Sequence, residues 1–469
     1  MDRRIFIASA ASLRLLDRIP AARARARGGI AAGNPSPPPG TVPAYIAQLS
    51  ASPSTKIAQV LPLTNNAYYN AAPTNGNTTY FTAASAIWQT NPGLIPVSGS
   101  GTTYYFHLRN VRNWSGGGGD PTNHWAIAHG GGHAGSCYNG VLKYDYNGTT
   151  APTGWSVIPG SETNADGTAA GIQAQITAGD VNQYGDGKPA SVHLYGGGLV
   201  TQPGVFVRYS GSPTGAGGAP GIVAAFQCDL TNTNPAVNPW TRLPDQNPGA
   251  SGSIVSAYDP TTNRIYFASE NASSLFLDMN TTPRTWSASS KFPTGQVQSS
   301  MAYDTKRGRV IMVGGFSSSQ YQLANINFAT EAVSGFTTFT PTGDPCPVLT
   351  TPGGGVGTVY DPLLDGYWLF GAQGVAFDHI YFMDAATFAV TAYQLQDLTN
   401  TNFDILAANA GFSQGSYTGF VFMSDWRALG VFTDSDQPAY VIRLPGTGVM
   451  TDAGGLVQTD AGSQVLTSN

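Results

Sequence analysis

The sequence predicts an all-β protein that repeats a small antiparallel sheet, and three observations support this fold class. First, 58 glycines and 32 prolines among 469 residues require dense turns between short strands. Second, 41% of the residues are hydrophobic although only 10% are charged, so the chain is folded and takes its polarity from uncharged side chains. Third, Tyr-Asp turns recur at Tyr258, Tyr303 and Tyr360, and no stretch has the apolar period of a helix.

The clearest repeat unit lies between His124 and Trp155. Residues 125–128 are apolar enough for a buried strand, and the glycines at 130–132 end that strand. Residues 140–146 alternate as a second strand before an Asn-Gly turn. Later units repeat the strand-then-glycine step, and their Tyr-Asp turns are 45 residues (304 − 259) and then 57 residues (361 − 304) apart. Spacings of this size are typical of a four-stranded repeat.

This order of paired glycines, a Tyr-Asp and a later Trp resembles one blade of a kelch-type β-propeller. The chain as a whole resembles bacterial exported kelch-type (galactose-oxidase-like) propellers with a GGGH loop. The resemblance implies an all-β, kelch-like β-propeller of six or seven four-stranded blades over residues 109–445. Residues 45–108 are then an N-terminal extension that supplies a closing strand, as at 57–61, or an extra blade. Residues 446–469 are a C-terminal tail or the closing strand.

The recurring aromatic and aspartate residues have structural roles in this interpretation. Blades that stack around an axis cover each other's faces, so the repeated rings are expected in packing between blades rather than in ligand contacts. These residues are Trp155, Trp240, Trp286 and Tyr303. Asp259, Asp304 and Asp361 end strands at turns, where an aspartate accepts hydrogen bonds from backbone amides.

The N-terminus resembles a twin-arginine signal peptide over residues 1–26. Arg3 and Arg4 precede a weakly apolar core, and small residues follow around a cleavage point at 24–26. We therefore expect a periplasmic or secreted protein, with a Pro/Gly/Ala linker at 27–44. The apolar core is short and interrupted by charges, and no later segment is long and apolar enough to span a membrane.

The charge of the chain argues against some partners. The formal net charge is −5, from 22 basic and 27 acidic residues, and cleavage after Ala26 would remove six arginines and two aspartates, giving 16 − 25 = −9. Nucleic acids and anionic lipids need a basic face, so neither is an expected partner. Three cysteines allow at most one disulfide, so the fold does not depend on a disulfide framework. We expect a monomer that meets a carbohydrate or a protein surface.

Histidines give the first candidate site, because four of the six lie between residues 124 and 193. His129 ends a strand and His133 follows the glycine loop, so both can face one mouth of the propeller. With Asp120 or His193 they would form an imidazole and carboxylate set for a divalent metal such as zinc or calcium. The alternative is that His129 is packed and His133 binds loop carbonyls.

The same region gives a catalytic interpretation. Polysaccharide lyases on propeller folds pair a His or Tyr base with an Arg that neutralises a uronate carboxylate. His129, His133, Tyr195 and Arg208 would supply these groups, although the acidic net charge argues against a polyanionic substrate. A glycoside hydrolase with paired carboxylates is a further alternative. The copper radical chemistry of galactose-oxidase-like enzymes is not expected, because the chain lacks the Tyr-His dipeptide of that motif.

The composition favours binding through the mouth of the propeller. Loops rich in Asn, Thr, Gly and aromatic residues suit an uncharged glycan, so the expected function is binding of extracellular or cell-envelope carbohydrate. The first alternative is a carbohydrate-active lyase or hydrolase that uses the GGGH-loop histidines. The second is a propeller that binds other proteins.

Overall fold

The computed structural model of the chain describes its sheets and most of the turns between them. The described residues are 41–63, 116–129, 139–163, 183–190, 192–194, 196–209, 212–213, 224–245, 254–269, 274–291, 299–315, 320–351, 354–408, 416, 419–432 and 438–445. The chain divides into two units, Met1–Pro35 and Ser36–Asn469, and everything described lies in the second. The predicted signal peptide, most of the predicted linker and the predicted C-terminal tail lie outside the described residues.

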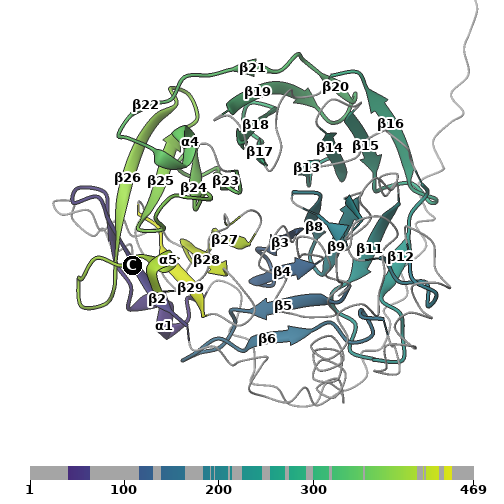
Figure 1. The fold of residues 1–469 in the computed structure, drawn as a ribbon, viewed down its shortest axis with the longest axis horizontal. Coiled ribbons are helices and arrows are strands. Elements are labelled where there is room, and N and C mark those ends of the chain that lie inside the picture. Colours follow the sequence, from purple (N-terminus) through teal and green to yellow (C-terminus); the bar gives the residue numbers. More distant parts are fainter. Residues whose placement is uncertain are drawn as a thin grey trace, which may run out of the picture. The chain divides into compact units, whose positions relative to one another are not determined.

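Four antiparallel sheets of four or five strands stand alone within the second unit (Figure 1). The first holds β3 (Gly116–Asp120), β4 (Trp125–His129), β5 (Val141–Asp145) and β6 (Gly154–Val157). The second holds β8 (Gly198–Gln202), β9 (Val205–Tyr209), β11 (Ala225–Asp229) and β12 (Trp240–Arg242). The third holds β13 (Ile254–Asp259), β14 (Arg264–Ser269), β15 (Ser274–Asp278) and β16 (Thr285–Ser289). The fourth holds β17 (Ser300–Asp304), β18 (Arg309–Gly314), β19 (Gln320–Asn327), β20 (Ala332–Val333) and β21 (Thr337–Thr338).

The remaining long strands form one ten-stranded sheet. One half of it holds β23 (Gly357–Asp361), β24 (Gly366–Phe370), β25 (His379–Asp384) and β26 (Ala389–Gln396), with β22 (Thr342–Gly343) on β26. The other half holds β27 (Phe420–Met423), β28 (Ala428–Phe432) and β29 (Ala439–Arg443). The N-terminal β2 (Ile57–Pro62), which also pairs with β1 (Ala51–Ser52), joins the halves: it lies parallel to β26 and antiparallel to β29.

The protein is thus all-β, with sheets arranged like the blades of a propeller. Four separate blades are seen, not the six or seven predicted, because β2 fuses the last two groups of strands into one sheet. The first strand of each group lies toward the centre of Figure 1, and β3, β8, β13, β17 and β23 contact one another in that order. The other described elements are small: a two-stranded sheet of β7 (Val192–His193) and β10 (Ser212–Pro213), and the helices α1 (Ala44–Ala47), α4 (Pro347–Thr350) and α5 (Ile405–Ala408).

The glycine run at 116–119 is the first strand of the first sheet, a role that the sequence did not suggest. A Cβ atom on Gly118 would lie 2.9 Å from the backbone nitrogen of Val200 in the second sheet. A Cβ atom on Gly119 would lie 2.5 Å from the Cβ atom of Val421 in β27. Both distances are shorter than atoms tolerate, so glycine lets β3 approach the first strands of its two neighbours.

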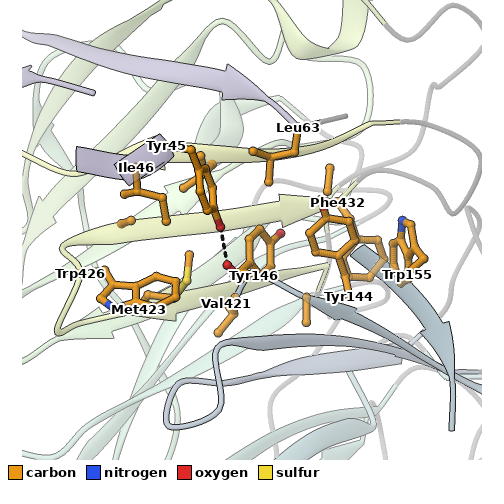
Figure 2. Close-up of a cluster of buried hydrophobic side chains, with 14 of the residues drawn as sticks. Tyr45, Ile46, Leu63, Tyr144, Tyr146, Trp155, Val421, Met423, Trp426 and Phe432 are labelled. Atoms are coloured by element: carbon orange, nitrogen blue, oxygen red, sulfur yellow. Dashed lines mark hydrogen bonds between the residues drawn. The ribbon is translucent and has the colours of Figure 1, made fainter. Parts of the chain in front are cut away.

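The core lies between neighbouring sheets rather than inside any one of them. Figure 2 shows the cluster in which the first sheet meets β27–β29 and α1. Tyr45 of α1 donates a hydrogen bond to the carbonyl oxygen of Tyr146, and Trp155 packs edge to face on Phe432 with ring centroids 5.1 Å apart. Trp240 and Trp286 pack between other sheets, which confirms the predicted role of these rings, whereas Tyr303 both packs between the third and fourth sheets and lines a cavity there.

The two ends of the sheets differ in the connections that they carry. At one end, which we call the turn end, the first and second strands of five groups are joined by four residues each: 121–124, 260–263, 305–308, 362–365 and 424–427. Asp259, Asp304 and Asp361 each accept hydrogen bonds there from backbone amides of their own turn, as predicted. Connections at the opposite end, the loop end, include 40 residues between β6 and β8 (158–197) and 23 residues between β26 and β27 (397–419).

Candidate functional site

Two buried polar side chains meet at the loop end, between the first and second sheets. His129 is the last residue of β4 and Arg208 the last but one of β9, and both strands run toward the loop end. Nη1 of Arg208 lies 3.2 Å from Nε2 of His129. His129 is 1% exposed and Arg208 is fully buried. The fold thus brings together two of the four residues predicted to act in catalysis.

The hydrogen bonds of His129 define its protonation state. Its Nδ1 lies 3.2 Å from the carbonyl oxygen of Gly140. A guanidinium can only donate, so Nε2 is the acceptor toward Arg208 and Nδ1 carries the proton that Gly140 accepts. Burial, and then the charge of Arg208, hold the pKa of His129 well below its usual range. With both nitrogens engaged, the neutral ring has no free lone pair for a metal or for a substrate proton.

Arg208 retains hydrogen-bonding capacity. Its Nη1 also donates to the carbonyl oxygen of Ala190 at 2.7 Å, and its guanidinium lies 5.1 Å from the ring centroid of Phe226. Nε and Nη2 are buried and have no hydrogen-bond partner among the described residues. Burial lowers the pKa of Arg208 to about 9, so the group is still a cation at neutral pH. Two fixed donors on a cation suit a carboxylate, another oxygen ligand or an ordered water.

Asp120 lies at the other end of the same sheet. Asp120 pairs with Trp125, whereas His129 pairs with Gly116. Asp120 and His129 are therefore four residues apart along the strand direction, which is about 13 Å. The Asp120 carboxylate accepts hydrogen bonds from amides of its own turn and, at 2.7 Å, from the backbone of Gly204 in the second sheet. This placement does not fit a metal ion shared by Asp120 and His129. The described part of the chain holds no group of three metal-ligating side chains.

The other predicted site residues are not placed. His133 and Tyr195 lie outside the described residues, so their roles stay predictions. His193 belongs to β7, of which the backbone alone is described. The candidate site is therefore the Arg208–His129 pair, with the free donors of Arg208 as its reactive part.

Two further features at the turn end were not found from the sequence. Nε2 of His124 lies 3.0 Å from a carboxylate oxygen of Asp425, and its ring stacks on Trp426 with centroids 3.6 Å apart, which ties the first sheet to the last. A cavity of about 620 Å³ opens between the third and fourth sheets. Its sequence signal is Gly308, which stands at the turn position where the other Tyr-Asp turns have Asn263 or Asp365.

Comparisons with known proteins found similar structures but no related family or curated sequence. No protein-family model and no curated protein sequence matches the chain. Among solved structures, a fungal alcohol oxidase of the AA5 family in complex with copper is 12% identical, with a TM-score of 0.40, over 73% of this chain and 63% of the oxidase. A luciferin-regenerating enzyme is 10% identical, with a TM-score of 0.39, over 72% of this chain and 94% of that enzyme. The chain therefore spans less than two thirds of the length of the oxidase.

None of the helices in the described part of the chain is long and apolar enough to cross a bilayer.

Proposed function

We propose that this chain is an exported β-propeller protein that binds an extracellular or cell-envelope carbohydrate at the loop end of its sheets. The observation that carries the proposal is the difference between the two ends. At the turn end, five connections are four-residue turns, in three of which an aspartate accepts from backbone amides, and the longest connection, 230–239, has ten residues. The loop end carries the long connections, and loops on a rigid scaffold are where propellers bind ligands.

The chemistry of the chain supports a carbohydrate. Only 10% of the residues are charged, so the surface offers uncharged amides and hydroxyls rather than charge. Such groups match the hydroxyls of sugars. The N-terminal twin-arginine pattern supports a periplasmic or secreted protein.

The ten-stranded sheet counts as two blades in this proposal. Its halves repeat the order of the separate sheets, with β2 as the outermost strand of the last blade. A six-bladed ring closed by an N-terminal strand follows, and six blades lies within the number that the repeats predict.

The test measures glycan binding after a bulky polymer is attached at either the loop end or the turn end. The full chain, with Cys137→Ser to remove one thiol, is screened against neutral polysaccharides and uronic-acid polymers. Ala376→Cys, exposed at the loop end between β24 and β25, and Val237→Cys, 47% exposed at the turn end, are each coupled to a polyethylene glycol maleimide. Cys228 and Cys346 are buried and so protected from the reagent.

We expect binding of a polymeric glycan that is lost on modification at 376 and kept on modification at 237. Binding that survives modification at 376, or that is lost only at 237, would place the ligand elsewhere. A protein that binds neither class of polymer would contradict carbohydrate binding and favour the protein-interaction alternative.

One observation favours an enzyme as a second candidate. The free Nε and Nη2 of Arg208 are donors of the type that a uronate carboxylate requires in a polysaccharide lyase, but both are buried, so a substrate would have to displace the residues that cover them. His129 cannot be the base, since its Nε2 accepts from Arg208, so that role would fall to His133 or Tyr195. The test follows the absorbance of unsaturated product with polygalacturonate and alginate. Product that forms with the unchanged protein and is lost in Arg208→Met supports a lyase, and no product from either polymer excludes it for these substrates.

A further inference from the structure

The Tyr-Asp turns share a hydrogen bond that one of them lacks. In the third sheet, the hydroxyl of Tyr258 donates to Oδ1 of Asn263 at 3.0 Å. In the ten-stranded sheet, the hydroxyl of Tyr360 donates to Oδ1 of Asp365, also at 3.0 Å. Each acceptor is the last residue of its four-residue turn and has a positive φ, 51° for Asn263 and 54° for Asp365. The two turns therefore use the same side-chain position to bind the tyrosine.

The fourth sheet keeps the tyrosine and the turn but has glycine at the acceptor position. Gly308 has a φ of 60°, so its backbone matches the other two turns, yet it has no side chain to meet Tyr303. The Tyr303 hydroxyl makes no hydrogen bond to any described residue. Burial, together with the charges of Asp259 and Asp304, raises the pKa of Tyr303 to about 12, so this hydroxyl is a proton donor at neutral pH.

The space beside Gly308 is the cavity between the third and fourth sheets. Its volume of about 620 Å³ lies within the range of small-molecule sites, roughly 300–1,000 Å³. Tyr303 and Gly308 line it on one side, and Asp259 lines it from the turn of the third sheet. Asn325 and Asn327, at the end of β19, complete the polar part of the wall.

The lining favours a neutral ligand with several hydroxyl groups. Arg307 reaches the cavity, but its guanidinium is bound to Asp304 at 3.1 Å and to Asp365 at 2.8 Å, so it offers no uncompensated charge to an anion. The exposed side-chain amide of Asn325 makes no hydrogen bond to the described residues. The amide oxygen of Asn327 accepts from a backbone amide at 3.0 Å, which leaves its NH₂ group for a ligand.

We infer that this cavity binds a neutral mono- or disaccharide. The ring of Tyr303 packs edge to face on Phe328, with centroids 4.8 Å apart, and this contact holds it as a fixed wall of the cavity. An aromatic wall suits the apolar face of a sugar, while the Tyr303 hydroxyl and the two amides suit its hydroxyls. The site lies at the turn end, so it is separate from the loop-end binding proposed above.

The decisive variant restores the missing side chain. A Cβ atom on Gly308 would meet the carbonyl oxygen of Ile326 at 3.4 Å, an ordinary contact, and asparagine tolerates a positive φ, as Asn263 does. Gly308→Asn is therefore expected to fold, to accept the Tyr303 hydroxyl and to fill part of the cavity. Methyl glucoside, methyl galactoside, maltose and cellobiose are titrated into the full chain by saturation-transfer NMR and calorimetry. At least one sugar should bind, and Gly308→Asn should weaken it about tenfold or more.

Tyr303→Phe is the second variant, and Tyr258→Phe is its matched control, because the Tyr258 hydroxyl is already bound to Asn263. Loss of the Tyr303 hydroxyl should weaken sugar binding about threefold or more, the effect of one hydrogen bond, whereas the control should bind as the unchanged protein does. The inference is overturned if none of the four sugars binds, or if Gly308→Asn and Tyr303→Phe both bind them normally. Polyethylene glycol at 376 should not affect this binding, so the outcome is independent of the loop-end test.

Discussion

Nη1 of Arg208 donates to Nε2 of His129 across the boundary between the first and second sheets, and neither side chain reaches solvent. This bond exists only while His129 is neutral, because a protonated imidazole has no acceptor to offer. It also fixes the tautomer, since the other ring nitrogen must then donate to Gly140. The pair therefore couples the stability of this boundary to pH.

His129→Gln should reduce the acid sensitivity of the fold. The folded protein keeps His129 unprotonated because its pKa is lowered, whereas the unfolded chain binds a proton below about pH 6.5. The unfolded state thus holds more protons below that pH, and the free energy of unfolding falls as pH falls, by up to about 1.4 kcal/mol per pH unit from this group. Urea denaturation between about pH 7.5 and about pH 5 measures the slope. Equal slopes in the two proteins would show that His129 does not contribute.

Arg208→Met should be tolerated, whereas Arg208→Ala should not. Methionine fills similar volume and removes a buried cation with two unpaired donors, which offsets the lost bonds to His129 and Ala190, so we expect a free energy of unfolding within about 1 kcal/mol of the unchanged protein. Alanine leaves a cavity beside Phe226 and should cost about 2–4 kcal/mol. Urea denaturation at neutral pH separates the two. A large loss in Arg208→Met would mean that the guanidinium is well satisfied.

Asp361→Asn should be far more damaging than Asp384→Asn. Both aspartates bind backbone amides of a turn, but Asp361 is fully buried and also binds Nη2 of Arg427 at 2.8 Å and Nε1 of Trp368 at 3.0 Å. Asparagine leaves the Arg427 charge buried without its counterion, which should cost about 3–5 kcal/mol. Asp384→Asn loses weaker contacts to its turn, about 1 kcal/mol. Similar losses in thermal denaturation would contradict the importance of the ion pair.

Val60→Asp should destabilise the whole protein through β2. Val60 is fully buried and pairs with Ile442 of β29, so aspartate would place an unpaired charge in the core and cost more than about 3 kcal/mol. Thr55→Asp, on the exposed turn before β2, is the control and should change stability by no more than about 0.5 kcal/mol. Limited proteolysis should cut the Val60→Asp variant faster. Equal resistance would show that β26 and β29 do not need β2 between them for stability.

The sequence predicted the parts of the fold that depend on local pattern. The Tyr-Asp turns and the strands around them could be found because turn chemistry acts over a few residues, as at Asp259 and Asp304. The number of separate blades could not, because β2 pairs with a strand far along the chain: Val60 and Ile442 are 442 − 60 = 382 residues apart. No local pattern specifies such a partner.

The candidate site was predicted only in part. The sequence placed His129 and Arg208 near one another in neighbouring repeats, but not the direction of their side chains. Residues 126–129 of β4 are all buried, so both faces of this strand are covered and alternation cannot separate a packed histidine from an exposed one. Asp120 lies far from His129 because β3 runs toward the turn end, which places the Asp120 carboxylate there.

The double pairing of β2 has a consequence for how the molecule is made. Until Ala439–Arg443 has left the ribosome, a strand from the beginning of the chain cannot take its final place, and contacts so distant in sequence form slowly. During that interval β26 presents an unpaired backbone edge, and β29 presents another from its synthesis until β2 pairs with it; such edges are the surfaces that recruit other strands into aggregates. Docking of β2 covers both of these strand edges, so a chaperone for this protein would act before β2 docks.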